Sequence, residues 1–368
     1  MKLRIPRRIL MTADPIGGVW TFALELTRAF EPYGVEVVLA TMGARLTPAQ
    51  HQEVAGRKNL RVFESNYRLE WMDDAWDDVD RASDWLLTLA KRVQPDLIHL
   101  NGYSHALLPW RVPAVVTAHS CVLSWWRAVK KEEAPAQYNE YRGRVRAGLA
   151  AAQAIAAPTQ AMRESLAQNY AYSGKCLVIH NGRDARLFAP AEKAGCIFAC
   201  GRIWDEAKNL RLMDEVARWC EWPIEIAGNC CHPIKGSVTF SYARCLGNLP
   251  PREISQRFGR AAIFVSPAFY EPFGLAVLEA ALSGCVLVLA DIPSLRELWR
   301  GAAVFVAPDD ASALAETLNG LIQNERLRGE LSNLSRQRGF EFSPCRLAER
   351  YLAAYENCLA GELVEVAA

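Results

Sequence analysis

The sequence Ser266-Pro-Ala-Phe-Tyr-Glu271-Pro-Phe-Gly-Leu-Ala-Val-Leu-Glu279-Ala-Ala-Leu-Ser-Gly284 joins a strand pattern to a helix pattern. A short buried-strand run at residues 263–266 leads into the loop that holds Glu271, and an apolar helix pattern begins near Phe273. A second β-branched run follows at residues 286–290. A strand, a helix and another strand in this order predict a βαβ unit with parallel strands.

The same alternation extends outward over both halves of the chain. In the first half, the strand patterns lie at residues 9–13, 35–41, 96–100, 114–118, 154–157 and 177–180, and the helix patterns at about 19–33, 74–93, 136–151 and 159–170. In the second half, the strand patterns lie at 197–200, 224–227, 263–266, 286–290 and 304–307, and the helix patterns begin near 209 and 273 and fill 311–360. The alternation predicts an α/β protein with two Rossmann-like domains, each a parallel sheet covered by helices.

The segment Asn181-Gly-Arg-Asp-Ala-Arg-Leu-Phe-Ala-Pro190 interrupts this rhythm and predicts a linker. A chain of 368 residues has the length of two ordinary domains. We therefore expect an N-terminal domain over residues 1–182 and a C-terminal domain over residues 190–344.

Composition argues against several classes of protein. The 42 basic and 41 acidic side chains leave a net charge of +1, without the basic surplus that is typical of nucleic-acid-binding proteins. No stretch reaches the ~20 apolar residues of a membrane span. The run Ile9-Leu10-Met11 is too short for a signal peptide. We expect a cytoplasmic protein without a nucleic-acid partner, and a peripheral contact with the inner membrane face stays open.

Two clusters contain residue types that often bind metals, but their patterns do not favour a metal site. The sequence Cys230-Cys231-His232 lacks the ligand spacing of a zinc site, and the eleven cysteines of the chain are otherwise scattered, as expected for reduced thiols. The segment Asp73-Asp74-Ala-Trp-Asp77-Asp78-Val-Asp80 contains a D-x-D pattern, but it opens a predicted helix, where the dipole favours acids. We expect no metal site at either cluster.

Glu271 and Glu279 are the first candidate site residues. Ligands of open parallel sheets bind beyond the carboxyl ends of the strands, and helix N-termini attract anions. Gly274 lacks a side chain that would block a close approach. In a continuous helix, Glu279 would lie about two turns beyond Glu271, so that both face one ligand. The alternative is a helix cap at Glu271 and a solvated Glu279. However, apolar neighbours surround Glu279, and a buried carboxylate needs a partner, which a ligand hydroxyl would supply.

The second candidate is Gly201-Arg202-Ile-Trp-Asp-Glu-Ala-Lys208-Asn209, at the end of the first predicted strand of the second half. Arg202 offers a rigid donor fork and Lys208 a mobile charge, a pair that suits a diphosphate. A surface loop with a helix cap at Asn209 is the alternative. The segment is expected to lie opposite the Glu271 loop, and this position favours a role in ligand binding.

These motifs resemble the retaining nucleotide-sugar glycosyltransferases of GT-B fold, group 1, family four. The pair Glu271 and Glu279 matches the E-x7-E motif of that family, and Gly201-Arg202…Lys208-Asn209 matches its G-R-(x)n-K-N loop. The sequence Asn181-Gly-Arg-Asp resembles its N-G-V-D linker, with Arg183 in place of the usual apolar residue. The resemblance covers most of the chain and is specific for the family but not for the substrate.

The resemblance implies a donor site in the second domain. Arg202 and Lys208 would neutralise the leaving diphosphate. Glu271 would hold hydroxyls of the donor sugar, and Glu279 would hold the ribose of the nucleotide. Backbone amides would add support to the diphosphate, namely those of Phe273, Gly274 and Leu275.

The first domain contributes weaker candidates. Gly17 and Gly18 follow the first predicted strand, where their amides could reach a phosphate or an acceptor; alone, a Gly-Gly pair is often only a tight turn. The surrounding sequence is not the G-x-G-x-x-G fingerprint, which argues against a nicotinamide cofactor. His119 ends another predicted strand. A lone histidine is more often structural, but the family places a histidine there against the donor sugar, so His119 joins Arg202, Lys208 and Glu271 as a candidate catalytic residue without being an obligatory base.

The resemblance implies a metal-independent, retaining hexosyltransferase-type enzyme. It would transfer a sugar from a UDP-, GDP- or ADP-sugar to a hydroxyl acceptor on a glycan, a lipid-linked molecule or a small molecule, with no other cofactor. The first domain would be the acceptor side, and a helix at about 345–360 would pack back on it. Two alternatives stay open: a nucleotide-sugar 2-epimerase of the same architecture, and a catalytically silent partner subunit. Residues 125–131, rich in tryptophan and lysine, could contact the acceptor or a lipid surface.

Overall fold

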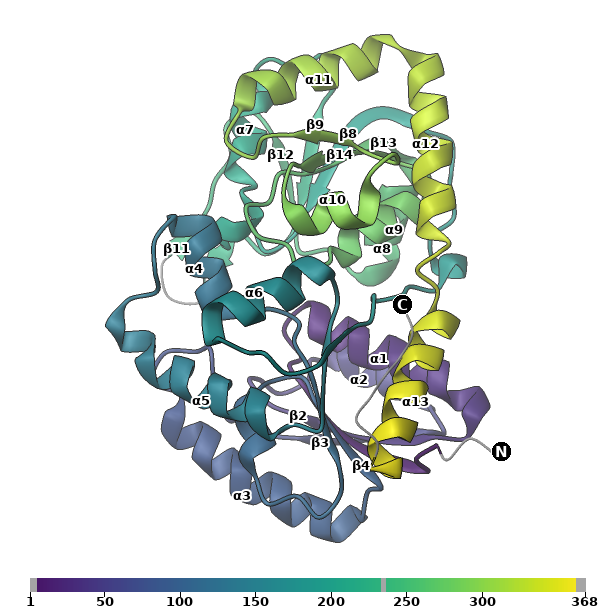
Figure 1. Ribbon diagram of the computed structural model, residues 1–368. Helices are drawn as coiled ribbons and strands as arrows, with labels where there is room; N and C mark the ends of the chain where they lie inside the picture. The colour runs from purple at the N-terminus through teal and green to yellow at the C-terminus, as the bar shows by residue number, and fades with distance from the viewer. Residues whose placement is uncertain (1–4, 233–235, 362–368) are drawn as a thin grey trace. The chain divides into compact units, whose positions relative to one another are not determined.

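The computed structural model describes residues 5–232 and 236–361, which form two compact units (Figure 1). The first unit comprises residues up to 124, residues 133–182 and the chain from 344 onward. The second unit comprises residues 125–132 and 183–343. The chain therefore passes between the units at more than one place, and the last helix belongs to the first unit.

A seven-stranded parallel sheet forms the centre of the first unit, in the order β3-β2-β1-β4-β5-β6-β7. The strands are β1 Arg8–Ala13, β2 Glu36–Thr41, β3 Leu60–Glu64, β4 Leu97–Leu100, β5 Ala114–Thr117, β6 Ala154–Ala157 and β7 Cys176–Val178. Their runs of buried residues on both faces are typical of a parallel sheet that is covered on both sides.

The helices of the first unit connect these strands. They are α1 Gly18–Phe30, α2 Pro48–Val54, α3 Trp76–Val93, α4 Val122–Lys130 (shared with the second unit from Trp125), α5 Asn139–Ala151, α6 Gln160–Tyr170 and α13 Pro344–Ala360. Short 3-10 turns lie at Glu31–Tyr33, Ser104–Leu107 and Ala136–Tyr138. Thr159 caps α6, because its hydroxyl accepts a hydrogen bond of 3.1 Å from the amide of Met162.

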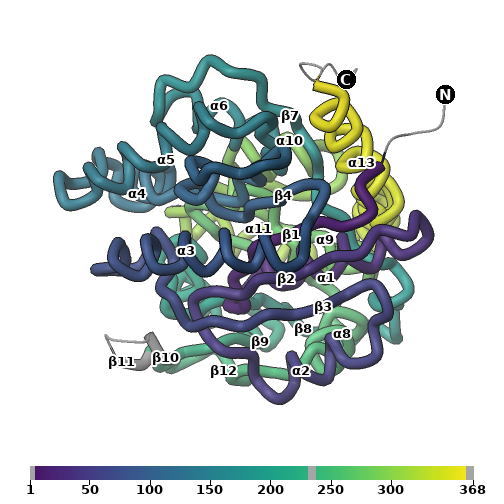
Figure 2. Tube along the Cα trace, turned by 90° about the horizontal axis from the view of Figure 1, so that it is seen from below, coloured from purple at the N-terminus to yellow at the C-terminus, as the bar shows by residue number. Residues whose placement is uncertain are grey.

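The last helix, α13, packs beside α1 (Figure 2) through an apolar face and a buried polar network. His99 of β4 bonds the hydroxyl of Tyr355 at 2.6 Å and that of Thr117 at 2.7 Å. Tyr351 bonds Thr117 at 2.9 Å. Burial and the nearby His119 lower the pKa of His99 to about 3, so its ring is neutral at neutral pH. The network satisfies polar groups that would otherwise be costly to bury.

A six-stranded parallel sheet forms the centre of the second unit, in the order β12-β9-β8-β13-β14-β15. The strands are β8 Ala194–Cys200, β9 Ile224–Ala227, β12 Arg244–Gly247, β13 Ala261–Ser266, β14 Val286–Ala290 and β15 Val304–Val306, and β10 Cys231–His232 pairs with β11 Gly236–Ser237. The helices are α7 Arg211–Ala217, α8 Pro251–Arg260, α9 Leu275–Leu282, α10 Pro293–Trp299, α11 Ala311–Gln323 and α12 Glu325–Gly339. Short 3-10 turns lie at Ala185–Leu187 and Glu206–Lys208.

Alternating side chains divide the core of this sheet into two layers. Ile197 and Ile263 point to a cluster with α7 and α11. Their neighbours Phe198 and Phe264 point to the opposite cluster, which includes α8, α9 and α10. Because successive strand residues face opposite sides, a single run of apolar residues fills both layers.

The predicted fold class is confirmed in the two parallel α/β sheets, and three local expectations were wrong or incomplete. The stretch predicted as helical throughout 311–360 is three helices: Asn324 ends α11 and caps α12 through the amide of Leu327 at 3.0 Å, and residues 340–343 separate α12 from α13. The helix predicted from Phe273 begins at Leu275. The sequence patterns also missed several elements, namely α2, β3, β12, α8 and α10.

Candidate active site

Two loops of the second unit follow neighbouring strands at one edge of its sheet. The loop after β8 holds Arg202 and Lys208, and the loop after β13 holds Glu271. Strands β8 and β13 pair in parallel, with Ile263 opposite Ile197. Their carboxyl ends therefore lie side by side, where ligands of such sheets bind.

Lys208 and Glu271 join the two loops directly. The ammonium Nζ of Lys208 lies 2.5 Å from the carboxylate Oε2 of Glu271, and the side chains are 22% and 16% exposed. The amide of Phe269 donates a 2.9 Å hydrogen bond to the carbonyl of Ala207. The hydroxyl of Ser294 donates one of 2.6 Å to the carbonyl of Glu271. The structure thus brings together two residues that the motifs predicted for one site.

Asp205 holds the guanidinium of Arg202. One Nη of Arg202 lies 2.8 Å from Oδ2 of the nearly buried Asp205, and the indole N–H of Trp125 donates to Oδ1 at 3.2 Å. Burial acts to raise the pKa of Asp205, but Arg202, Lys208 and the hydrogen bond from Trp125 lower it below its usual value. Asp205 is therefore a charged support for Arg202, and the sequence analysis missed it although it lies inside the motif.

Residues 125–131, for which the acceptor and a lipid surface were both considered, contact the same two loops within the second unit. Besides the contact of Trp125 with Asp205, the ammonium of Lys130 lies 2.5 Å from Glu206. Lys131 lies 5.5 Å from the ring centroid of Phe269. These side chains support the loops in this structure.

Glu279 has a partner that the sequence analysis did not anticipate. The guanidinium Nε of Arg183 lies 2.8 Å from its carboxylate Oε1, and both side chains are 14% exposed. The carboxylate therefore has a charged partner within the chain, and its burial does not by itself require a ligand hydroxyl. The signal was present in the linker, where an arginine replaces the usual apolar residue.

Gly274 explains how the chain turns between Glu271 and α9. It is the N-cap of α9 and has φ of +85°, a left-handed conformation that favours glycine. A Cβ there would lie 3.0 Å from Val277 Cγ2 and 3.3 Å from Glu271 Cγ. Since the helix starts only at Leu275, Glu271 lies in the loop, as the sequence predicted, and the two glutamates do not share a continuous helix. Phe273 is buried against Phe342, and its amide precedes the helix.

A second close approach stabilises the loop after β8. A Cβ on Gly228, which follows β9, would lie only 1.8 Å from the carbonyl oxygen of Gly201. The amide of Ile203 donates to the carbonyl of Asn229 at 3.1 Å. Backbone contact with the neighbouring strand end thus fixes the start of the Arg202 loop.

The candidates of the first unit lie at the carboxyl edge of its own sheet. Gly17 is the N-cap of α1 with φ of +109°, and Gly18 is the first residue of the helix, which follows β1. His119 follows β5, and its Nε2 lies 2.7 Å from Oδ1 of Asn101, which follows β4. Strands β1, β4 and β5 are neighbours, so these residues share one edge.

His119 is a neutral histidine with a defined orientation. Asn101 donates its Nδ2 to the carbonyl of Thr12 at 2.6 Å, which assigns its Oδ1 as the acceptor for His119 Nε2–H. The ring of His119 packs edge-on against Phe22 at 4.5 Å between centroids. Burial lowers the pKa of His119 to about 3. Asn101 was missed by the sequence analysis; a polar residue directly after a buried strand is the signal that could have found it.

The acidic cluster at residues 73–80 and the cluster at residues 230–232, for which no metal site was expected, make other contacts. Asp77 and Asp78 lie in the first turn of α3, and Asp78 pairs with Arg81. The thiol of Cys230 lies 3.6 Å from that of Cys245, while the side chains of Cys231 and His232 lie outside the described part. Within residues 5–232 and 236–361, no group of three or more acidic, cysteine or histidine side chains is arranged to hold a metal ion. Among the described helices, none is long and apolar enough to cross a membrane.

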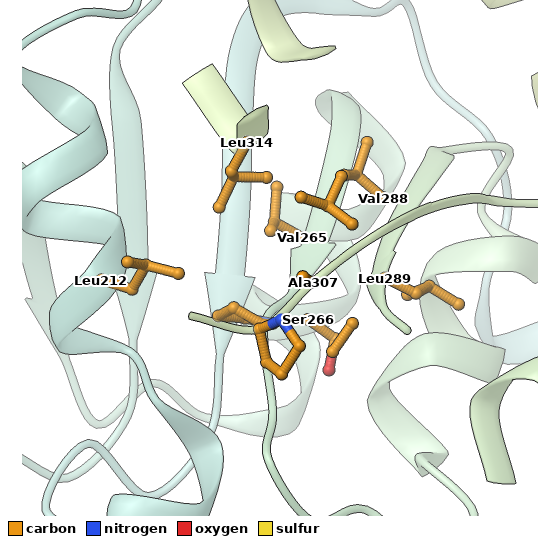
Figure 3. A pocket seen from close by; sticks show the side chains of 11 residues that line it. Leu212, Val265, Ser266, Val288, Leu289, Ala307 and Leu314 are labelled. Atoms are coloured by element: carbon orange, nitrogen blue, oxygen red, sulfur yellow. The ribbon is translucent and has the colours of Figure 1, made fainter. Parts of the chain in front are cut away.

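A small pocket of the second unit lies beside these loops but has a different character (Figure 3). Its lining is apolar apart from Ser266 and includes Leu212, Val265, Val288, Leu289 and Leu314. Such a lining cannot neutralise a diphosphate. The side-chain amide of Asn209 donates hydrogen bonds to the carbonyls of two lining residues, Pro267 at 3.1 Å and Pro308 at 2.7 Å.

The two parallel-sheet units, with the charged loops at the strand ends of the second, have the architecture of a glycosyltransferase of GT-B fold. The chain matches the models of two families, Glycosyltransferase Family 4 over residues 16–187 and Glycosyl transferases group 1 over residues 243–338. It belongs to this group of glycosyltransferases, as the motifs predicted.

Relatives of known function cover most of the chain. α-Maltose-1-phosphate synthase of Mycobacterium tuberculosis is 27% identical over 71% of this chain and 77% of its own length. D-Inositol 3-phosphate glycosyltransferase of Corynebacterium glutamicum is 23% identical over 95% of this chain and 94% of its own length. Among solved structures, sucrose-phosphate synthase of Thermosynechococcus elongatus has a TM-score of 0.80 at 17% identity, covering 96% of this chain and all of that one. Anabaena HepE in complex with UDP-glucose has a TM-score of 0.73 at 16% identity, and the match covers 94% of this chain and 98% of that one.

Proposed function

We propose that the protein transfers a sugar, with retention of configuration and without a metal ion, from a nucleotide-diphosphate sugar to a hydroxyl acceptor. The observation that supports this most is the pairing of Lys208 with Glu271 beside Arg202 at the carboxyl edge of the second sheet. Two cations and a carboxylate at one edge suit a ligand that carries both a diphosphate and sugar hydroxyls.

Charge on the leaving group is the main electrostatic problem of this reaction. As the bond between the anomeric carbon and the diphosphate oxygen breaks, negative charge grows on the diphosphate, where Arg202 and Lys208 stabilise it. Asp205 keeps Arg202 in place for this task. The backbone amides of Phe273, Gly274 and Leu275 add donors at the start of α9.

Retention follows from the roles assigned to the remaining groups. The acceptor oxygen bonds to the anomeric carbon on the face that the diphosphate leaves, and its proton passes to a phosphate oxygen. Glu271 holds sugar hydroxyls and is already paired with Lys208, so it is not assigned as a nucleophile. His119, with a pKa lowered to about 3 by burial, acts as a neutral hydrogen-bonding group toward the sugar and not as an obligatory base. Gly17 and Gly18 offer amides at the start of α1 to the same substrates.

The names of the similar proteins suggest which substrates to test first. Anabaena HepE is described in complex with UDP-glucose, so UDP-glucose heads the donor series, with GDP- and ADP-sugars after it. Two of the similar proteins are named for phosphorylated small molecules, sucrose phosphate and inositol 3-phosphate. Phosphorylated sugars and polyols therefore lead the acceptor series.

The test is turnover with anomerically pure donors in the presence of EDTA, followed by NMR of the product. We expect release of the nucleoside diphosphate that depends on acceptor, and a glycoside with the donor's anomeric configuration. An inverted product would contradict the retaining mechanism. Conversion of the donor without any acceptor would instead favour a 2-epimerase, and a folded protein that binds a nucleotide without turnover would favour a silent subunit.

A further inference from the structure

We infer that Arg183 is a positioning residue of the nucleotide subsite, whose guanidinium holds the carboxylate of Glu279 where it receives the ribose hydroxyls of the donor. This inference rests on the proposed function, in which Glu279 binds the ribose. The ion pair connects the linker that opens the second unit with α9, at 2.8 Å between Nε and Oε1.

Arg183 is itself held firmly at its backbone and its side chain. Its amide donates to the carbonyl of Phe342 at 3.1 Å. Its guanidinium carbon lies 4.9 Å from the ring centroid of Phe188, which is buried in the core of the second unit. The next residue, Asp184, caps a 3-10 turn by accepting from the amide of Arg186 at 3.0 Å. A side chain fixed in this way loses little further freedom when a ligand binds, so it is a pre-organised support.

The chemistry of the pair suits recognition of a diol. An ionised carboxylate has two oxygens with about four acceptor positions. The positively charged guanidinium of Arg183 beside Oε1 holds the carboxylate electrostatically. The 2′ and 3′ hydroxyls of a ribose are neighbouring donors, which a carboxylate in a fixed orientation can bind together. Without a cation nearby, the largely buried Glu279 would be more costly to keep ionised.

The alternative is that Arg183 only ties the linker to α9. In that case, removal of Arg183 changes the stability of the protein and weakens the binding of ribose and deoxyribose nucleotides by the same factor. A positioning role instead changes how well the site distinguishes a ribose from a deoxyribose, because the carboxylate that reads the hydroxyls is no longer oriented. The ratio of the two affinities separates these roles.

The experiment uses calorimetric titration of the full chain with UDP, GDP and ADP and with their 2′-deoxy counterparts. For the nucleotide that binds, we expect the wild type to prefer the ribose form by about tenfold or more, as for loss of a hydrogen bond to a charged group. In Arg183→Val, this preference falls to about twofold or less. Arg183→Lys, which keeps the charge but not the planar N–H donors, lies between them. Arg186→Val is the matched control, because Arg186 is in the same linker, is 85% exposed and pairs with Asp184; it keeps the full preference.

The outcomes separate the inference from the proposed function. If the wild type binds none of the diphosphates, the donor site fails and the inference fails with it. If the wild type prefers the ribose form and Arg183→Val keeps that preference, the inference is wrong while the donor site stands. If Arg183→Val does not fold, Arg183→Lys gives the same comparison. Glu279→Gln should reduce the preference as Arg183→Val does, and the double variant should lose nothing more; independent, multiplying losses would contradict the inference.

Discussion

The ammonium of Lys208 lies 2.5 Å from the carboxylate of Glu271, so that residues 63 positions apart in the sequence form one ion pair at the edge of the second sheet. Each residue belongs to a different motif of the family, and in the proposed function Lys208 is the cation for the diphosphate and Glu271 the carboxylate for the sugar. The proposed chemistry depends on this relationship.

Replacing Lys208 by methionine removes the cation and leaves Glu271 without it. We expect turnover of the nucleotide sugar to fall by about 10²–10³-fold, as for the loss of one preorganised group that stabilises transition-state charge. We also expect a loss of stability of about 1–3 kcal/mol, since a partly buried carboxylate loses its charged partner. Steady-state kinetics and urea unfolding measure the two effects. Lys58→Met at an exposed position is the control, and a Lys208→Met variant with wild-type turnover would contradict the role.

Asp205→Asn tests the support of Arg202. The asparagine keeps the shape but loses the charge, so we expect kcat to fall by about tenfold, since a charge-assisted hydrogen bond is worth about 1.5–3 kcal/mol. The pKa of Asp205 is lowered in the folded protein, so its contribution to stability is present above the ordinary carboxyl pKa near about 4 and is lost as pH falls through the lower folded value. The difference in Tm between wild type and Asp205→Asn should therefore shrink below about pH 4. A difference independent of pH would contradict the ionised state.

His119 is expected to stay neutral throughout the working range of pH. Its pKa falls from about 6.5 in the unfolded chain to about 3 in the folded protein, so the unfolded chain binds a proton that the folded protein does not. Stability should then decrease as pH falls from about 6.5 toward 3, and His119→Gln should reduce that slope by up to about 1.4 kcal/mol per pH unit. His99, whose pKa is also lowered to about 3, still contributes its own part of the pH dependence of stability in this variant. Urea unfolding between about pH 4 and 8 measures the slope. An unchanged slope would show that His119 is protonated in the folded protein.

Gly274→Ala tests the turn before α9. The alanine would have to adopt a positive φ with its Cβ 3.0 Å from Val277, so we expect a loss of about 1–2 kcal/mol and weaker nucleotide binding. Gly320 is the matched control, because it lies inside α11 with no atom within 4 Å of an added Cβ. Gly320→Ala should stabilise the protein by up to about 1 kcal/mol. If the two substitutions had equal effects on thermal unfolding, the requirement for glycine at position 274 would be contradicted.

Regular patterns in the sequence predicted the alternating sheets and the motif residues, because both depend on local spacing. The strand before Glu271 and the helix after Gly274 are long apolar runs whose type is clear, although the helix start was placed two residues early. Strand β12, Arg244–Gly247, is a partly exposed edge strand with little apolar pattern and was missed. The capping asparagine at 324 divides two helices that appear continuous by composition alone.

The partners of the site residues could not be predicted in the same way. Arg183 reaches Glu279 across 96 positions, and His119 reaches Asn101 between two strands, so both contacts depend on how the sheets bring distant segments together. Asp205, in contrast, is three positions from Arg202 and could have been found as a local ion pair. The partner of a charged residue is therefore predictable when it lies within one turn and is otherwise a property of the fold.

The central claim, that the loops after β8 and β13 bind a nucleotide diphosphate, is tested most directly by calorimetric titration of the wild type and of Arg202→Met with UDP, GDP and ADP in EDTA. We predict that at least one diphosphate binds the wild type and that Arg202→Met weakens it by about tenfold or more, the loss expected for a charge-assisted contact. Absence of binding to the folded wild type, or equal affinity in Arg202→Met, would contradict the account.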